Sequence, residues 1–246
     1  MDHKRRISIA DAIASKLLKR YKNEILYIGI SGSTGSGEDL RYSDLDLVVI
    51  SKSLEKEEYY WLIDGISIGI EFFPLWRVKK IFNEINDEWP LRVGEILGSK
   101  PVYDKNNTIG KLGEEIHSIP DSTFNRAVAG PLFMARGGIN KVKNSFEIKN
   151  LPKMKEASSR LILATNRLIA LTNRSYFNRE GIAELKKVSE FAKLPDNYVI
   201  LCDKILSSNN IEELYQFCLE LYGSCEKFAE KNNVRLRHWS ADKIEV

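Results

Sequence analysis

Apolar residues recur at helical spacing over the first 21 residues of the chain. Positions 9, 10, 13, 14, 17, 18 and 21 fall on one face of a helix, which predicts an amphipathic helix over about residues 5–21. Two nearly continuous apolar runs follow, EILYIGI at 24–30 and DLDLVVI at 44–50. Runs of this length between turn residues are typical of buried strands.

The dipeptide Asp64-Gly65 lies between two apolar runs, which is a β-hairpin signal. We therefore expect a third strand over about residues 66–73, followed by helices over about residues 75–86 and 107–118. Beyond Pro120 the pattern is helical throughout. It predicts further helices over about residues 122–145, 153–173, 179–192 and 210–231.

This change of pattern divides the chain at Pro120. We predict an α+β protein with an N-terminal α/β domain containing a mixed sheet at residues 1–120 and a C-terminal helical bundle at residues 121–246. A chain of 246 residues can bury a substantial core in such an arrangement. Within the bundle, Pro131 and Gly137-Gly138 are expected to kink or weaken the first helix.

The composition is that of a globular protein, with 43% hydrophobic and 29% charged residues. No apolar run approaches the ~20 residues that span a bilayer, and the N-terminus lacks an apolar signal core, so we expect a cytoplasmic protein without a membrane partner. The net charge of +3 supports a nucleic-acid partner only weakly. Cys202, Cys218 and Cys225 match no zinc pattern and are predicted to be buried core residues.

Two aspartates interrupt the second apolar run at its start. Asp44 and Asp46 are two positions apart, so on a strand they project from the same face. Unpaired carboxylates on a buried strand are costly, and a hard divalent cation such as Mg²⁺ removes that cost. Glu71, a single acid in the third strand, supplies a further ligand and makes a two-metal site for phosphoryl transfer a candidate. A capping or solvated Asp-x-Asp is the alternative interpretation.

A turn rich in glycine and serine precedes these aspartates. Glycines allow backbone N–H groups to approach a phosphate closely, and the Ser33 hydroxyl can donate to one. The turn lacks the Gly-Lys-Ser/Thr of a Walker A loop. Taken alone, it also fits a flexible hairpin loop.

The combination of a strand, Gly-Ser, an Asp-x-Asp strand and an acid on a third strand resembles the nucleotidyltransferase superfamily of DNA polymerase beta. This resemblance implies that Gly32 and Ser33 hold a nucleoside triphosphate, with ATP the expected donor. It implies that the catalytic and metal ligands, here for two Mg²⁺ ions, are Asp44, Asp46 and Glu71. The family usually has an arginine three residues after the serine, where this chain has Ser36, so Arg41 is expected to substitute, with Ser43 beside it as a further nucleotide-binding residue.

Within this superfamily the chain resembles the kanamycin nucleotidyltransferase family most. The similarity lies in DEWPLRVGEILGSKPVYD at 87–104, LTNRSYFNREGIAEL at 171–185 and LPDNYVILCDKI at 194–205. It implies a nucleotidyltransferase domain followed by an up-and-down helical bundle, and a homodimer with active sites at the subunit interface. It also implies an aminoglycoside acceptor and a role in antibiotic resistance.

The acceptor half of the site departs from this family. The family's general base is a glutamate on the first long bundle helix, and the matching stretch AVAGPLFMARGGINKVKNS contains no acid. Glu147, Glu156, an acid of a partner subunit, Asp46 or Glu71 are the alternatives for this role. The family's phosphate-binding lysine falls between Lys141 and Lys143, which also fit the pattern of solvated helix charges.

The sequence therefore predicts a Mg²⁺-dependent nucleotidyltransferase that moves a nucleoside monophosphate from an NTP to an acceptor hydroxyl, with an aminoglycoside as the acceptor implied by the resemblance. Two alternatives stay open. One is transfer to a protein or RNA acceptor, and the other is a degenerate, non-catalytic nucleotide-binding module.

Overall fold

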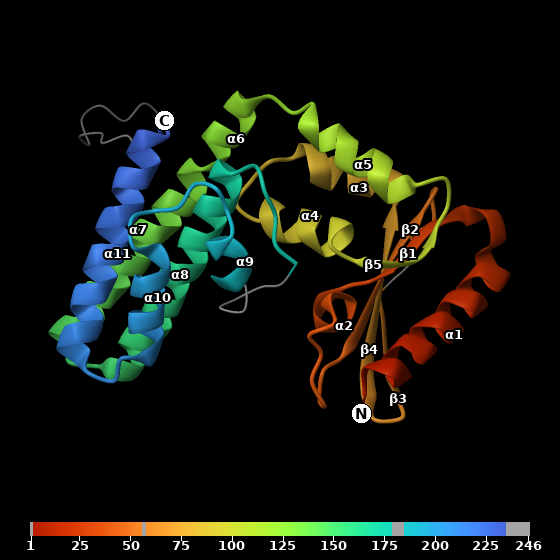
Figure 1. The fold of residues 1–246 in the computed structure, drawn as a ribbon, viewed down its shortest axis with the longest axis horizontal. Coiled ribbons are helices and arrows are strands. Elements are labelled where there is room, and N and C mark those ends of the chain that lie inside the picture. Colours follow the sequence, from red (N-terminus) through yellow and green to blue (C-terminus); the bar gives the residue numbers. More distant parts are fainter. Residues whose placement is uncertain (1, 56–57, 179–184, 235–246) are drawn as a thin grey trace. The chain divides into compact units, whose positions relative to one another are not determined.

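The computed structural model of the chain describes residues 2–55, 58–178 and 185–234. The chain forms two compact units (Figure 1). Unit 1 comprises Met1–Pro120 and Tyr176–Glu180, and unit 2 comprises Asp121–Ser175 and Gly181–Val246.

Unit 1 is built on a five-stranded sheet with the strand order β3-β4-β2-β1-β5. Strands β2 and β4 are parallel, and the other neighbouring pairs are antiparallel. The mixed sheet and the helical second half confirm the predicted α+β class. The strands are β1 (Ile25–Ile30), β2 (Leu45–Ser51), β3 (Tyr59–Ile63), β4 (Ile66–Pro74) and β5 (Lys100–Asp104).

The hairpin predicted at Asp64-Gly65 joins β3 to β4. Both turn residues have positive φ values, 52° and 75°, as a two-residue type I′ turn requires. Strand β5 was not predicted, because its five residues are exposed or only half-buried and include Pro101. It forms the edge of the sheet, where a proline is tolerated.

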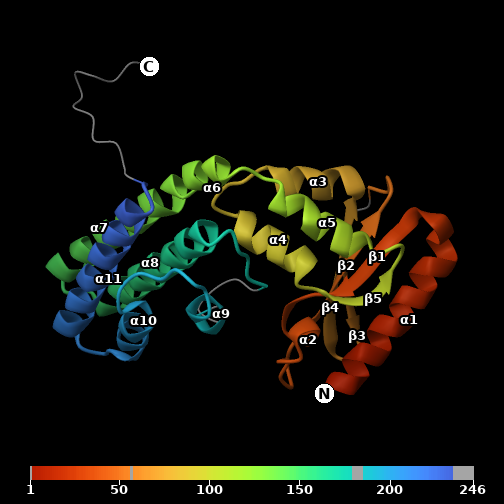
Figure 2. The same ribbon diagram turned by 45° about the horizontal axis from the view of Figure 1, so that its top comes forward.

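Helices cover both faces of the sheet (Figures 1 and 2). Helix α1 packs its apolar stripe, including Ile9, Ile13 and Leu17, against one face of the sheet. Helices α3 and α5 cover the other face. The helices of unit 1 are α1 (His3–Tyr21), the 3₁₀ turn η1 (Lys22–Glu24), α2 (Gly32–Ser36), α3 (Leu75–Asn83), α4 (Trp89–Leu97) and α5 (Thr108–His117).

Two of these helices differ from the sequence predictions. The glycine-rich turn after β1 is a short helix, α2, closed by Gly37 in the left-handed conformation. Helix α4 was not predicted, although Pro90 in its first turn is a helix-start signal. The other predicted helices of unit 1 exist and end within a few residues of the expected positions.

A buried arginine on α1 holds the loop between α2 and β2. The Arg6 side chain is 1% exposed, and its guanidinium lies 2.8 Å from Oδ2 of Asp39, which is equally buried. It also donates hydrogen bonds to the backbone carbonyls of Leu40, Arg41 and Ser43 at 2.9–3.0 Å. This loop leads directly into Asp44 and Asp46, so Arg6 fixes the path of the chain into β2.

The charge of Asp39 is stabilised by its neighbours. Burial disfavours its ionisation, but the hydrogen bond and charge of His3, 2.6 Å away, and the charge of Arg6 hold the pKa of Asp39 below its usual value. A carboxyl whose pKa is lower in the folded state stabilises the fold near neutral pH. That contribution is lost as the pH falls through the folded-state pKa.

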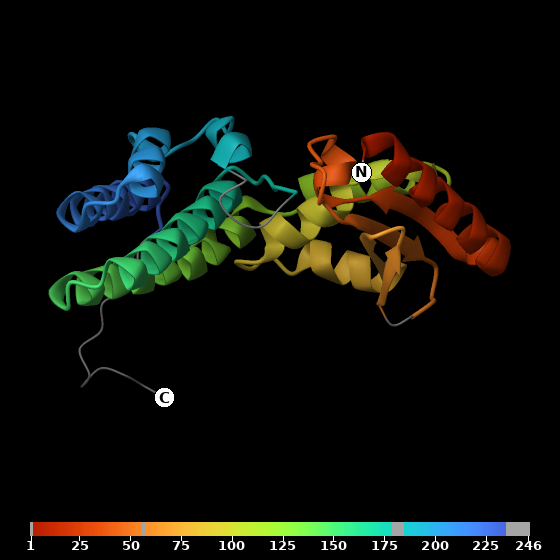
Figure 3. The same cartoon turned by 90° about the horizontal axis from the view of Figure 1, so that it is seen from below.

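Unit 2 is helical, and its helices α7 and α8 run side by side (Figure 3). Helix α11 packs against both of them, and α10 against α8 and α11. Helix α10 was not predicted, and the predicted helix over 179–192 lies partly outside the described residues. The helices are α6 (Asp121–Ala127), α7 (Ala129–Glu147), α8 (Leu151–Thr172), α9 (Leu185–Ser189), α10 (Tyr198–Ser207) and α11 (Ile211–Lys231).

The helix predicted over 122–145 is divided by one residue, Val128, into α6 and α7. The backbone of Val128 itself stays in the helical region, with φ −59° and ψ −26°. The predicted weakening at Pro131 is confirmed, because this residue has no N–H to donate to the carbonyl of Ala127 and its ring crowds that carbonyl. Helix α7 continues through Gly137-Gly138. A Cβ at Gly138 would lie 3.2 Å from Cα of Leu161, so this glycine allows α7 and α8 to pack closely.

The three cysteines are free and buried, as predicted. Cys218 and Cys225 lie against hydroxyls of α8, those of Ser158 and Thr165. Among the described residues, no helix combines the length and the apolar character that crossing a bilayer requires.

We predict that Arg6→Met lowers the free energy of unfolding at pH 7 by about 3–5 kcal/mol. The substitution leaves the Asp39 carboxylate and three carbonyls without their buried donor. Urea denaturation measures the effect. The neighbouring Arg5→Met is the control, because Arg5 is exposed with its partner Asp64, and a change of about 0.5 kcal/mol or less is expected. Equal effects of the two substitutions would contradict the role assigned to Arg6.

Candidate active site

Three residues lie in a row across neighbouring strands on one face of the sheet. Asp46 of β2 is paired with Gly69 of β4, and Gly69 is paired with Tyr60 of β3. The next position along the pairing of β2 and β4 places Glu71 opposite Val48. Residues that alternate with these on β2 and β4 pack in the α1 core, so Asp46, Gly69 and Glu71 project from the opposite face.

Gly69 provides the space that the Asp46 carboxylate occupies. A Cβ at position 69 would lie 2.7 Å from Oδ1 of Asp46, closer than any side chain can stand. On the other side of Asp46, a Cβ at Gly32 would lie 3.6 Å from Oδ2, and Gly32 has a positive φ of 60°. The two glycines therefore leave both carboxylate oxygens accessible.

The Gly-Ser turn is tied directly to the strand that carries the aspartates. The N–H of Ser31 donates to the carbonyl of Asp46 at 2.9 Å, and the Thr34 hydroxyl donates to the carbonyl of Asp44 at 3.0 Å. Gly32 and Ser33 lie between these two anchors and begin α2. The structure thus brings the predicted phosphate-binding turn against the start of the strand that carries Asp46.

A pocket of about 250 Å³ opens at this point of the sheet. Asp46 and Glu71 line it together with Ser31 and Gly69. Three further residues of its wall were not predicted, and these are Glu58, Tyr60 and Glu95. The pocket is therefore rich in carboxylates, and its wall contains no lysine, arginine or histidine among the described residues.

This crowding of acids raises the pKa values of the central carboxyls. Burial, then the charges of Asp44 and Glu95, raise the pKa of Asp46 to about 6. Burial, then the charges of Glu95 and Glu58, raise the pKa of Glu71 to about 7, although Arg77 acts in the opposite direction. A cation bound here would relieve this repulsion.

The donor set fits a hard divalent cation. Carboxylate oxygens are the protein ligands that Mg²⁺ prefers, and the glycines beside Asp46 leave room at its oxygens. In the part of the chain that the structure describes, no three Asp, Glu, His or Cys side chains converge on one ion position. Of the three predicted ligands, Asp46 and Glu71 line the pocket and Asp44 does not, so the predicted set of three is not assembled around one ion position in the described structure.

Both halves of the chain match known families. Residues 11–103 match the nucleotidyltransferase domain, and residues 110–235, slightly more than half of the chain, match the KNTase C-terminal domain. The chain belongs to the kanamycin nucleotidyltransferase (KNTase) family. The family resemblance predicted from the sequence is confirmed, and the protein is an enzyme of the nucleotidyltransferase kind.

Relatives of this KNTase-family enzyme cover nearly its whole length. Two proteins named aminoglycoside nucleotidyltransferase (4′), from Staphylococcus aureus and a Bacillus species, are each 21% identical to it over 239 residues, 94% of this chain and 93% of theirs. A putative protein adenylyltransferase from Methanocaldococcus jannaschii is 29% identical over 115 residues, 44% of this chain and 78% of its own.

A solved structure shares the fold. The nucleotidyltransferase-like protein from Exiguobacterium sibiricum aligns with a TM-score of 0.52 and 12% identity, covering 95% of this chain and 83% of its own.

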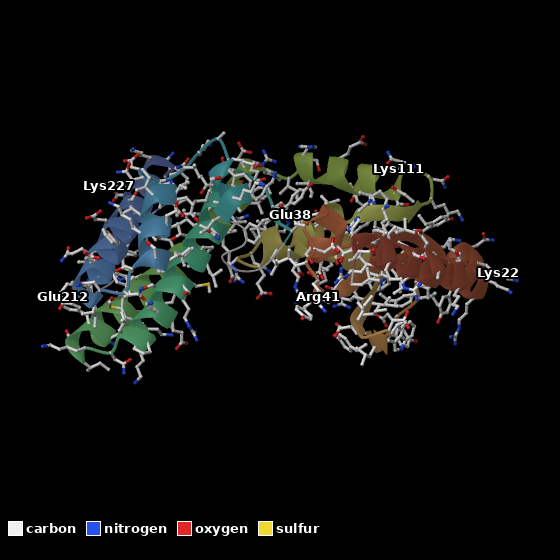
Figure 4. The ribbon with its side chains drawn as sticks, turned by 60° about the horizontal axis from the view of Figure 1, so that its bottom comes forward. Lys22, Glu38, Arg41, Lys111, Glu212 and Lys227 are labelled. Atoms are coloured by element: carbon white, nitrogen blue, oxygen red, sulfur yellow. The ribbon has the colours of Figure 1, made fainter. Side chains whose placement is uncertain are left out.

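The remaining predicted residues of unit 1 lie outside the pocket that Asp46 and Glu71 line. Asp44 is exposed and lies one residue before β2, and its charge reaches Asp46. The Ser43 hydroxyl accepts a hydrogen bond from the N–H of Leu40. Arg41 is exposed with its guanidinium over the ring of Tyr42, and Figure 4 shows it at the periphery of the loop. None of these three residues lines the pocket.

The predicted residues of the bundle lie on α7 and α8 of unit 2. Lys141 lines two adjoining pockets between these helices, and Arg160 lines both of them too. Lys143 is exposed and lines neither pocket. Of the alternative bases, Glu147 is exposed, and Glu156 pairs with Arg160 at 2.7 Å.

Glu58, Tyr60 and Glu95 are polar residues of the pocket that sequence reasoning missed. Glu95 is a single acid among the buried residues Val93, Gly94 and Ile96 of α4, which is the same signal that identified Glu71 on β4. Without a prediction of α4, this signal had no structural context. Tyr60 could not be predicted as a pocket residue without the register of β3 on β4, which pairs it with Gly69.

We predict that Glu71→Gln stabilises the metal-free enzyme at pH 8. The pKa of Glu71 is about 7 in the folded protein against an ordinary value of 4.5, so the folded state binds more protons between these values and its stability falls as pH rises. Removing this carboxylate should raise the free energy of unfolding in EDTA by about 1–2 kcal/mol at pH 8, after allowance for solvent screening, and have little effect at pH 4.

Urea denaturation at both pH values tests this. Glu115→Gln is the control, because Glu115 is well exposed and pairs with Lys79 at 2.9 Å, and about 0.5 kcal/mol or less is expected at either pH. A destabilised Glu71→Gln at pH 8 would show that the acids do not repel one another as described.

Proposed function

We propose that this enzyme transfers a nucleoside monophosphate, with ATP as the donor, to an acceptor hydroxyl in a Mg²⁺-dependent reaction. The observation that supports this most is the placement of Asp46 and Glu71 on one face of adjacent parallel strands, with the Gly32-Ser33 turn tied to the same strand. The nucleotidyltransferase-domain match over residues 11–103 agrees with that arrangement.

In this proposal the donor half of the site lies in unit 1. Gly32 and Ser33 bind the triphosphate, and Asp44, Asp46 and Glu71 hold the metal. Ser43 and Arg41 extend the nucleotide-binding surface along the loop, and Lys141 and Lys143 are the candidates from the bundle. Bound Mg²⁺ would neutralise the triphosphate and stabilise the charge of the leaving pyrophosphate.

We propose an aminoglycoside as the first acceptor to test, because two relatives that carry this name span 94% of the chain. A role in antibiotic resistance would follow from it. A protein hydroxyl is the second candidate, supported by the relative named a putative protein adenylyltransferase. The homodimer and the cytoplasmic location implied by the family resemblance belong to the same proposal.

The experiment is transfer of label from [α-³²P]ATP, together with pyrophosphate release, over a panel of acceptors. The panel contains kanamycin and other aminoglycosides, a protein mixture, RNA and water. Labelled aminoglycoside supports the first acceptor, and labelled protein supports the second. Binding of MgATP without pyrophosphate release over the panel would indicate a degenerate nucleotide-binding module.

We predict that Asp46→Asn lowers turnover by at least about 10²-fold, because it removes the negative charge that holds the metal against the triphosphate. EDTA should abolish turnover, and excess Mg²⁺ should restore it. Asp11→Asn is the matched control, since Asp11 is exposed on α1 away from the pocket, and it should leave the rate unchanged. Wild-type turnover by Asp46→Asn would refute the assignment of the donor site.

A further inference from the structure

Four carboxylates line the pocket, and three of them already have an assignment. Asp46 and Glu71 are the proposed metal ligands, and Glu58 accepts the hydroxyl proton of Tyr60 in a hydrogen bond. Glu95 is the fourth. Its ion-pair contact in the described part of the chain is with Arg92, at 3.9 Å, which is beyond hydrogen-bond distance.

Packing contacts and a hydrogen bond fix α4, the helix that carries Glu95. Helix α4 is anchored at its start by Trp89, which is 1% exposed and donates its indole N–H to the carbonyl of Phe82 at 2.9 Å. The residue before Glu95 is Gly94, where a Cβ would lie 2.0 Å from the carbonyl oxygen of Phe177. The N–H of Phe177 donates in turn to the carbonyl of Pro90. Glu95 therefore sits on a helix that is fixed from two sides.

Glu95 faces the same space as the proposed metal ligands. Its charge raises the pKa values of both Asp46 and Glu71, so it lies within electrostatic reach of each of them. It comes from a helix and they come from the sheet, so it borders the pocket from a different wall. Glu95 therefore reaches the pocket from α4 and not from the strands that carry the proposed metal ligands.

The stretch of α7 that the family resemblance matches to the general base contains no acid. Between Ala129 and Phe146 this helix contains no aspartate or glutamate. A hydroxyl that attacks phosphorus must lose its proton to a base within about 3 Å or through one water.

We propose that Glu95 is a catalytic residue that accepts a hydrogen bond from the acceptor hydroxyl and takes up its proton. This inference rests on the proposed function. The acceptor oxygen bonds to the α-phosphorus while the bond from that phosphorus to the pyrophosphate oxygen breaks. Pyrophosphate leaves with the electron pair, and the proton passes to the Glu95 carboxylate and then to water.

The surroundings of Glu95 suit this role. Burial, opposed by Arg92 and aided by Glu58, raises the pKa of its carboxyl above the usual value and makes it a better proton acceptor. The other titratable groups of the pocket wall are Asp46, Glu58, Tyr60 and Glu71. The carboxylate also has no hydrogen-bond donor of its own among the described residues, so a substrate hydroxyl would not have to displace one.

The test separates the acceptor half of the site from the donor half. Glu95→Gln keeps the size of the side chain and removes the base, and Glu95→Asp keeps the base at a shorter reach. Binding of the non-hydrolysable donor α,β-methylene-ATP with Mg²⁺ is measured by calorimetry for each variant. Turnover is measured with [α-³²P]ATP and the acceptor that the panel identifies, water included. Glu88→Gln is the control, because Glu88 is on the same helix and contacts the same Arg92, at 4.0 Å, but lies outside the pocket.

We expect Glu95→Gln to lower kcat by about 10²–10⁴-fold, with donor affinity unchanged within twofold. Glu95→Asp should recover part of that loss, and the acidic limb of the wild-type pH–kcat profile should disappear in Glu95→Gln. Glu88→Gln should match the wild type. Unchanged donor binding also shows that the variants are folded.

Three results would overturn the inference. Turnover of Glu95→Gln within threefold of the wild type would exclude the base. Loss of donor binding, as in Asp46→Asn, would make Glu95 a metal-site residue. A wild-type enzyme that releases no pyrophosphate with any acceptor would refute the proposed function, and this inference with it. An active wild type with an equally active Glu95→Gln would refute only this inference.

Discussion

The ion pair between Arg6 and Asp39 is the constraint on which the acidic pocket and its proposed donor site depend. A guanidinium that is 1% exposed must have its hydrogen bonds satisfied, and this one is satisfied by the loop that leads into β2. The large apolar side chains of the loop, Leu40 and Tyr42, are exposed and do not anchor it in the core. Its shape is therefore set by polar contacts with α1. The first helix of the chain, far from Asp46 in sequence, thus determines where the strand that carries Asp46 begins.

Small residues do the complementary work inside the pocket. Gly69 separates Asp46 from Tyr60 across three strands, and Gly32 clears the other side of the same carboxylate. The space of the pocket therefore depends on two glycines, in a sheet whose other buried positions are largely isoleucine, valine and phenylalanine. The acids that line it repel one another, so the apo enzyme carries a cost that a bound cation would relieve. Stability and catalysis are opposed at this place.

The sequence predicted most of unit 1 because its signals were local. Asp64-Gly65 requires a tight turn, and the apolar runs around it can only be strands. The pairing of Asp46 with Gly69 could not be predicted in this way, because the parallel contact of β2 with β4 depends on which strands become neighbours. The break at Val128 shows a related limit. Pro131 marks the disturbance, but the interruption lies three residues earlier, next to Ala127, whose carbonyl would have accepted the lost hydrogen bond.

Glu95 shows why one wall of the site escaped sequence reasoning. The residues around it, Val93, Gly94 and Ile96, form a short apolar stretch that reads equally well as strand or helix. Helix α10 escaped for the same reason, since VILC in its first turns is rich in residues that favour strands. Where an apolar stretch was too short to show whether it forms a strand or a helix, the position of its functional side chains could not be predicted either.

The segment Tyr176–Glu180 belongs to unit 1, although it follows helix α8 of unit 2 in the chain. Its residue Phe177 is the backbone against which Gly94 packs. The nucleotidyltransferase unit is therefore discontinuous along the chain. A fragment ending at Pro120 would lack Phe177 and its contacts with α4, so the first half of the chain does not contain the whole of its own unit.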